Sequence, residues 1–342
     1  MSISSVVETC RHSSLAQAVS ASLSTCFHCA EKVVSCVLSK CFYVGYDALS
    51  ARVAKERTQQ LITGSNARPL VCQNDKNVSV DTLYIPSSHP NRTGNVIVFA
   101  ETTSYQDRLE QGLPSKYRYF LDSGMDVVLW NPTELQNRQY AQDLLSVLRA
   151  LKRQHPDQRI VVKGHCATVE PAIATAADLA QELRDDSITL ILDRGYADVE
   201  AFTRSFTVLT KLPLIHRVIQ GQFSCDGMRK LQTFPGKIIF IAPEDPTADQ
   251  LVYWAGKNLT YAMHELRQTN GFREDAFIKL GEGSDHWSSW NSDEYTQITA
   301  ELSKVGLVAS NYLGLTSRAF SARPPLNFFK RTCLPILTKA CC

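Results

Sequence analysis

A Gly-x-Cys turn lies at the centre of the stretch Val161-Val162-Lys163-Gly164-His165-Cys166-Ala167-Thr168. This pattern is typical of a buried strand that turns sharply into a helix and exposes one side chain at the turn. Such a turn strains the backbone and needs small neighbours, a need that Gly164 and Ala167 meet. Thr168 departs from the pattern, because a second glycine is usual there. Cys166 is therefore either the nucleophile of such an elbow or a small buried hydrophobe.

Short apolar runs before and after this turn predict the strands of a sheet. Continuous runs of this kind are typical of strands that are buried on both faces. They occur at Val96–Ala100, Val127–Trp130, Ile160–Val162, Thr189–Leu192 and Lys237–Ile241. An antiparallel pair at the sheet edge is predicted at Leu70–Gln73 and Val78–Ile85.

Helical patterns alternate with these runs. They cover Tyr140–Gln154, Ala172–Leu183 and Leu251–Gln268, and a further helix is expected after Asp293. Strand and helix alternating in this way predict a mostly parallel sheet with right-handed crossovers.

The order of the patterns divides the chain into three parts. Residues 1–65 carry apolar residues at a spacing of three to four, which predicts an N-terminal helical extension. Residues 66–306 carry the α/β pattern and include a short helical cap at about 196–234. Residues 307–342 form a basic, apolar C-terminal tail.

Composition excludes several classes of protein. The 342 residues include 36 Lys plus Arg and 34 Asp plus Glu, so the net charge of +2 gives no reason to expect a nucleic-acid partner. Eleven scattered cysteines in a chain of this length indicate reduced thiols in a cytosol rather than a disulfide framework. The polar start of the chain lacks the apolar core of a secretory signal. The sequence contains no run of eighteen apolar residues, so no membrane-spanning helix is predicted.

Two further candidate residues follow Cys166 in the order nucleophile, acid, histidine. Asp245 lies in Ala-Pro-Glu-Asp-Pro, directly after the last predicted strand, and His286 lies in Gly-Ser-Asp-His-Trp. Each falls where a loop would leave the carboxyl edge of the sheet, which is where open α/β sheets bind ligands. Asp249 and Asp193 are the alternatives for the acid.

From Val78 to about Gly306 the sequence resembles the α/β-hydrolase superfamily. Val127-Val128-Leu129-Trp130-Asn131-Pro132, the Gly-His-Cys turn and Leu192-Asp193-Arg194-Gly195-Tyr196 are most similar to the CHLPS hydrolase-like family of obligate intracellular bacteria. The resemblance implies an α/β-hydrolase fold with Cys166 as the nucleophile, in place of the usual serine, His286 as the base and Asp245 as the acid. It also implies a protein that acts in the cytoplasm or is delivered into a host cell.

A cysteine at this position suits acyl transfer. The start of the following helix and His286 would both stabilise its thiolate, and the backbone N–H groups of Ala167 and of a residue near Thr102 would hold an oxyanion. We expect a hydrolase or acyltransferase for ester, thioester or amide substrates, with a small acyl compound or an acylated protein as its partner and with no cofactor. Glu101 stands where relatives usually carry a His-Gly pair, and its charge would repel an oxyanion unless it points away. The competing hypothesis is an inactive scaffold that binds a partner or a membrane.

Two other groups of cysteines invite interpretation. Cys26, His28 and Cys29 have metal-like spacing, but no second pair follows at zinc spacing, so we expect burial on an apolar helix face and no metal site. Cys341 and Cys342 end a basic, apolar tail and are candidate lipidation sites. Peripheral membrane contact is expected through this tail or through the N-terminal helices, and the alternative is a tail that packs on the body or stays disordered.

Overall fold

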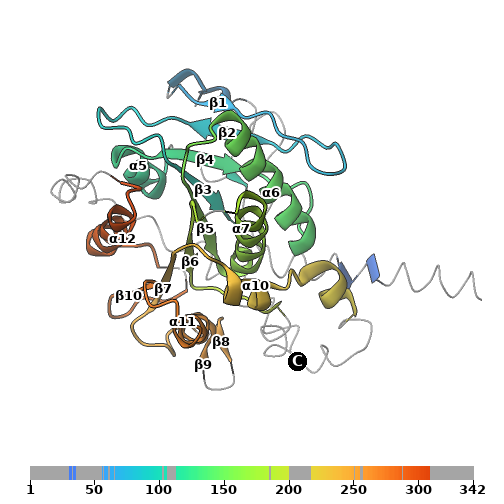
Figure 1. The fold of residues 1–342 in the computed structure, drawn as a ribbon, viewed down its shortest axis with the longest axis vertical. Helices are drawn as coiled ribbons and strands as arrows, with labels where there is room; N and C mark the ends of the chain where they lie inside the picture. The colour runs from blue at the N-terminus through green and yellow to red at the C-terminus, as the bar shows by residue number, and fades with distance from the viewer. Residues whose placement is uncertain are drawn as a thin grey trace, which may run out of the picture.

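An eight-stranded sheet forms the centre of the molecule in the computed structural model of the chain (Figure 1). Its strands are β1 (Arg68–Pro69), β2 (Thr82–Ile85), β3 (Val96–Ala100), β4 (Asp126–Trp130), β5 (Ile160–His165), β6 (Ile188–Asp193), β7 (Ile238–Pro243) and β10 (Ala276–Leu280). They lie in the order β1-β2-β4-β3-β5-β6-β7-β10. Strand β2 runs antiparallel to both of its neighbours, and every other pair in the sheet is parallel.

The structure describes most of the chain from residue 66 to residue 308. The described residues are 31–32, 34–35, 56, 58–60, 62–64, 66–101, 104–105, 113–184, 186–199, 217–249, 251–254, 257–286 and 288–308. Cys26, His28, Cys29, Cys341 and Cys342 lie outside these ranges, so the interpretations that concern them stay predictions.

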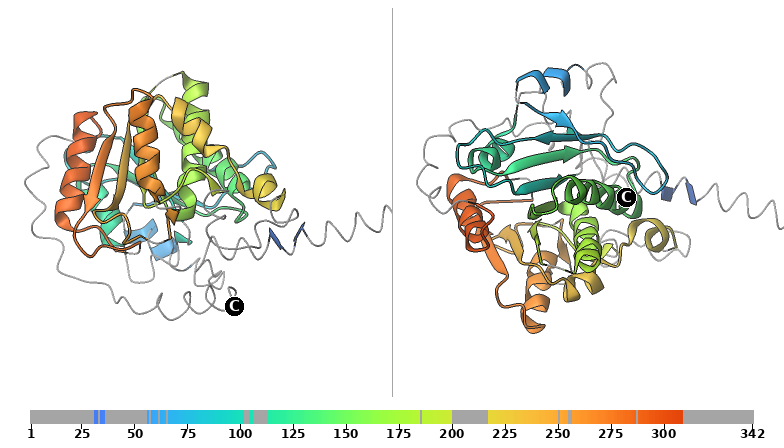
Figure 2. Two further views of the ribbon diagram at one scale, coloured as in Figure 1. Left: turned by 90° about the horizontal axis from the view of Figure 1, so that it is seen from below. Right: turned by 45° about the horizontal axis from the view of Figure 1, so that its top comes forward.

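Helices cover both faces of the sheet (Figure 2). One layer contains α6 (Asn137–Gln154), α7 (Val169–Leu183), α10 (Gly227–Thr233) and α11 (Leu259–Thr269), and the other contains α5 (Ser115–Asp122) and α12 (Ser292–Lys304). Alternate residues of the central strands enter the two cores: Val96 and Val98 pack in the first, Ile97 and Phe99 in the second. Burial on both faces explains why these strands are continuous apolar runs.

The five buried strands predicted from the sequence are confirmed, and so is an antiparallel pair at the edge, but its bounds differ from those predicted. Strand β1 lies just before the predicted Leu70–Gln73, and β2 covers only the second half of the predicted Val78–Ile85. Strand β10 and helix α5 were not predicted. The sequence of β10 is Ala-Phe-Ile-Lys-Leu, and its exposed Lys279 interrupts the apolar run because the strand lies at the sheet edge.

The prediction of a helix from Leu251 was wrong at its start. Residues Tyr253–Trp254 and Lys257–Asn258 form the paired strands β8 and β9, and α11 begins at Leu259. The side chain of Asn258 accepts hydrogen bonds from the backbone N–H groups of Thr260 and Tyr261. This N-cap fixes the first turn of α11 and explains why the helix starts there.

The predicted extension and cap are described in part. In the extension, Glu31 lies 3.1 Å from the guanidinium of Arg217, and Ser35 accepts a hydrogen bond from Gln136 at 3.2 Å. The described part of the cap contains a π-helix, η3 (Ile219–Phe223), followed by α10. None of the helices within the described ranges has both the length and the apolar character needed to cross a bilayer.

Candidate active site

Cys166 occupies the turn between β5 and the helices that follow it. Its φ of 55° is in the left-handed region, which is rare for a residue other than glycine. A one-turn 3-10 helix, η1 (Cys166–Thr168), begins at the cysteine and continues into α7. The thiol is free and half-buried. A residue with a positive φ, placed between a parallel strand and a helix, has the backbone conformation that is typical of a nucleophile elbow.

Two glycines let the backbone pack closely around this turn. A Cβ at Gly164 would lie 3.0 Å from the Cα of Val169, and a Cβ at Gly195 would lie 2.8 Å from the carbonyl oxygen of Cys166. The Cβ at Gly195 would also lie 2.2 Å from a methyl group of Val169. The elbow is thus packed against the turn that follows β6, as well as against its own helix.

Thr168 stands at the position where the sequence pattern usually has a glycine, and its hydroxyl makes hydrogen bonds there. Its hydroxyl lies 2.7 Å from the carbonyl oxygen of Ala100, to which it donates, and it accepts a hydrogen bond from the backbone N–H of His165 at 2.9 Å. Ala100 is the last residue of β3. The threonine therefore ties the end of β3 to the elbow, which a glycine could not do.

His286 is buried and pairs with Asp249. Its Nδ1 lies 2.8 Å from Oδ1 of Asp249, and the two side chains are 4% and 0% exposed. Asp249 lies in the loop that follows β7, six residues after Pro243. The carboxylate that contacts the candidate base is thus the first of the two alternatives to Asp245.

The structure corrects the assignment of Asp245 as the partner of His286. The Asp245 side chain is exposed, and its carboxylate accepts hydrogen bonds from the backbone N–H and the hydroxyl of Thr247 at 2.9 and 2.7 Å. These bonds lower the pKa of Asp245. Asp245 therefore caps its own turn, a common role for an aspartate followed by proline.

The other alternative acid, Asp193, lies at the end of β6 among cations. Its carboxylate lies 3.2 Å from Nζ of Lys163 and 2.7 Å from Nε of Arg194. Burial alone would raise the pKa of Asp193, but the charges of Arg194 and Lys163 lower it well below its usual value. Asp193 is thus the buried counter-ion of two cationic side chains, Lys163 and Arg194, and is not the carboxylate that contacts His286.

The electrostatics of His286 link it to the cysteine. Burial alone would lower the pKa of the imidazole, but the electrostatic influence of Cys166 and the hydrogen bond to Asp249 raise it to about 10. Negative charge close to the ring favours the protonated imidazole, which explains the direction of this shift. The structure therefore pairs His286 with Asp249 and places its ring 5.1 Å from that of His165, the neighbour of Cys166.

The comparisons with known proteins bear on this architecture. No protein-family model matches the chain, and no curated protein matches its sequence. An esterase from Pyrococcus furiosus has a similar structure, with a TM-score of 0.50 and 13% identity over 76% of this chain and 95% of its own. The chain has the α/β-hydrolase fold. The esterase domain of a Rhodothermus marinus protein aligns with 72% of this chain and 100% of its own, with a TM-score of 0.47 and 12% identity.

The carboxylate of Glu101 is paired with a cation in this α/β-hydrolase fold. Its carboxylate lies 2.6 Å from Nζ of Lys116 and accepts a hydrogen bond from the hydroxyl of Tyr117 at 2.9 Å. Its own carbonyl accepts a hydrogen bond from Tyr140. The repulsion expected from this residue is thus removed, because the ion pair with Lys116 neutralises the carboxylate. Thr102, the predicted oxyanion residue beside it, lies outside the described residues, whereas Ala167 directly follows Cys166 and is buried.

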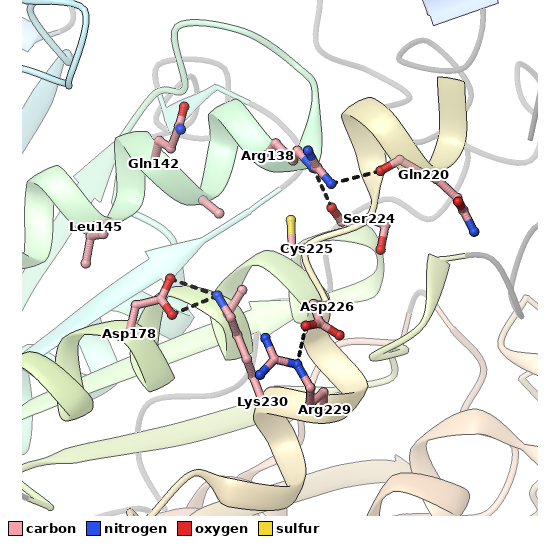
Figure 3. Close-up of a pocket in the computed structure, with 12 residues that line it drawn as sticks. Arg138, Gln142, Leu145, Asp178, Gln220, Ser224, Cys225, Asp226, Arg229 and Lys230 are labelled. Carbon is pink, nitrogen blue, oxygen red and sulfur yellow. Dashed lines mark hydrogen bonds and ion pairs between the residues drawn. The ribbon is translucent and has the colours of Figure 1, made fainter. Parts of the chain in front are cut away.

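A cavity of about 540 Å³ lies between α6, α7 and residues 220–230 of the α/β-hydrolase domain (Figure 3). Its charged side chains are satisfied within the structure: Lys230 pairs with Asp178, Arg229 pairs with Asp226, and Arg138 donates to the carbonyls of Gln220 and Ser224. The lining includes Cys225 but not Cys166, His286 or Asp249. Burial raises the pKa of Cys225 well above its usual value, so this thiol is protonated at neutral pH.

Proposed function

We propose that the chain is a cysteine-dependent acyl hydrolase or acyltransferase whose catalytic triad is Cys166, His286 and Asp249. The observation that carries the proposal is the buried imidazole of His286, which contacts Asp249 at 2.8 Å while the charge of Cys166 helps to raise its pKa to about 10. Nucleophile, acid and histidine follow one another in the order that the α/β-hydrolase fold uses. The esterases that share this fold support a hydrolase.

The chemistry begins with the thiolate of Cys166. Its sulfur attacks the carbonyl carbon of an ester, thioester or activated amide, and the tetrahedral intermediate collapses with loss of the leaving group, which takes a proton from His286. The product is a thioester between the acyl group and Cys166. His286, now neutral, removes a proton from water, which attacks the thioester and releases the acid and the thiolate. In an acyltransferase another nucleophile takes the place of water.

Two other parts of the site support this sequence of steps. The carboxylate of Asp249 orients the imidazole and stabilises its charged form. The backbone N–H of Ala167, together with that of a residue near Thr102, would hold the oxyanion of the tetrahedral intermediate. Neither the formation of the thioester nor its hydrolysis requires a cofactor. The substrate proposed is a small acyl compound or an acylated protein.

The experiment that tests the proposal compares the rates at which the cysteines are alkylated. Near neutral pH, a limiting amount of iodoacetamide is expected to label Cys166 at least about tenfold faster than the other ten cysteines, because in the proposed triad a protonated His286 stabilises the thiolate. Peptide mapping by mass spectrometry measures each rate. His286→Ala is expected to remove the advantage of Cys166. Slow, equal labelling of all the cysteines in the native protein would favour the inactive scaffold that binds a partner or a membrane.

A further inference from the structure

The loop that carries His286 is tightly folded on itself. It connects β10 to α12, and the hydroxyl of Ser288 accepts a hydrogen bond from the backbone N–H of Asp285 at 2.8 Å and donates to the Asp285 carboxylate at 2.9 Å. The carbonyl groups of Asp285, His286 and Ser288 accept hydrogen bonds from side chains outside the loop. These three carbonyls are therefore points at which side chains at the ends of β5 and β6 hold the loop.

Arg194 holds two of the three carbonyls. Its Nη1 donates to the carbonyl oxygen of Asp285 at 2.8 Å and to that of Ser288 at 2.7 Å. Its Nε and Nη2 donate to the carboxylate of Asp193 at 2.7 and 3.2 Å. The side chain is 4% exposed, and the backbone is in the left-handed region with a φ of 47°. A buried guanidinium with this many partners has a fixed position, and so have the carbonyls that it binds.

His165 holds the third carbonyl. Its Nε2 lies 3.3 Å from the carbonyl oxygen of His286, and the centroids of the two imidazole rings are 5.1 Å apart. A carbonyl can only accept, so Nε2 carries the proton. Burial lowers the pKa of His165 well below 6.5, and its neutral ring therefore does not repel a charged His286.

The two residues come from neighbouring strands. His165 ends β5 and faces Asp193 of β6 in the sheet register, and Arg194 directly follows Asp193. Gly195, the next residue, packs against the carbonyl of Cys166. The ends of β5 and β6 thus fix both the thiol and the loop that carries the imidazole.

We propose that Arg194 and His165 are positioning residues that hold the His286 loop through the carbonyls of residues 285, 286 and 288. The inference rests on the proposed function, because the imidazole that they position is that of the proposed base. Neither side chain is assigned a proton-transfer step. Their effect is to keep Nδ1 of His286 on Asp249 and its other nitrogen toward Cys166.

Arg194→Lys is the first test. Lysine keeps the positive charge beside Asp193, but it lacks the three separate nitrogens from which Arg194 reaches the carboxylate and both carbonyls. We expect kcat for p-nitrophenyl acetate to fall about 10- to 100-fold, with KM changed by less than about twofold, because the imidazole is displaced while the acyl site is kept. The matched control is Arg149→Lys, since Arg149 also pairs with a carboxylate, Glu182, but at the exposed surface. Its kcat should equal that of the native protein.

A spectroscopic measurement separates positioning from general destabilisation. In proton NMR, the Nδ1 proton of His286 should give a downfield signal that is protected from solvent exchange, and Asp249→Asn should remove it. In folded Arg194→Lys this signal should be lost or should exchange rapidly. If Arg194→Lys does not fold, His165→Leu replaces it, and the same two changes are expected, because the leucine cannot donate to the His286 carbonyl.

The outcomes distinguish the two proposals. A folded Arg194→Lys or His165→Leu protein with native kcat and a native Nδ1 signal would overturn the positioning role. A native protein that shows the Nδ1 signal but has no turnover that depends on Cys166 would overturn the proposed function, and the loss of the signal in the variants would still support the positioning of the loop.

Discussion

Asp249→Asn is expected to lower kcat/KM for p-nitrophenyl acetate about 10⁴-fold. The amide keeps the size of the side chain, but it presents either a neutral oxygen or an N–H to Nδ1 of His286, which now lies 2.8 Å from a carboxylate oxygen. The imidazolium loses its counter-ion, and the preferred tautomer of the neutral ring changes. Steady-state kinetics with the purified variant measure the loss.

Asp245→Asn is the matched control for this substitution. It makes the same chemical change four residues earlier in the same loop, at an exposed side chain that is bonded only to Thr247 among the interactions described. We expect kcat/KM to stay within about twofold of the native value, as for most surface substitutions. The opposite result, a large loss at Asp245 and none at Asp249, would contradict the assignment of the acid.

Cys166→Ala is expected to have the largest effect, a fall in kcat of about 10⁵- to 10⁶-fold toward the rate of the uncatalysed background. Without the sulfur no thioester can form, and the oxyanion site alone contributes little when no nucleophile is present. The elbow should still fold, because alanine is smaller than the half-buried cysteine and tolerates the turn no worse. Circular dichroism of the purified variant checks the fold, and release of p-nitrophenol measures the rate.

Cys225→Ala serves as the control for unspecific thiol chemistry. Cys225 is half-buried in the cavity beside α6 and α7, and burial raises its pKa well above the usual value. A protonated thiol is a poor nucleophile. The variant should therefore keep native turnover within about twofold. If Cys166→Ala kept its turnover and Cys225→Ala lost it, the reactive thiol would be Cys225, and the proposed nucleophile would be wrong.

Much of the fold could be predicted because it depends on local patterns. Strands that are buried on both faces are mostly apolar, and the strands at the centre of this sheet are so until near their carboxyl ends, where Lys163 and Asp193 lie. The turn at Cys166 could be predicted for a similar reason, since the close packing around Gly164 requires small residues at known positions. The edge strand Ala276–Leu280 could not, because one of its faces carries the exposed Lys279.

The acid could not be assigned from order and spacing alone. Asp245 and Asp249 both follow β7, and either satisfies the order of nucleophile, acid and histidine. One local signal distinguishes them, because Asp-Pro-Thr favours a turn in which the aspartate bonds to the residue two positions later, as Asp245 does with Thr247. An aspartate engaged in this way is less available to a distant histidine.

Contacts between distant residues explain what the sequence could not predict. The Glu101 charge is neutralised by Lys116, which belongs to α5, a helix that the sequence pattern did not predict. Arg194 binds carbonyl groups of the loop at residues 285–288. Every residue type has a backbone carbonyl, so the sequence does not reveal which carbonyls are bound. Such contacts require coordinates, because neither periodicity nor spacing encodes them.

The triad is tested most directly by capturing the acylated enzyme. The native protein is mixed with p-nitrophenyl acetate, quenched in acid within the first turnovers and mapped by mass spectrometry. We expect an acetyl group on Cys166 that hydroxylamine removes, and none on Cys166 in His286→Ala treated in the same way. An acetyl group confined to other residues, or equal acetylation of Cys166 with and without His286, would contradict a triad of Cys166, His286 and Asp249.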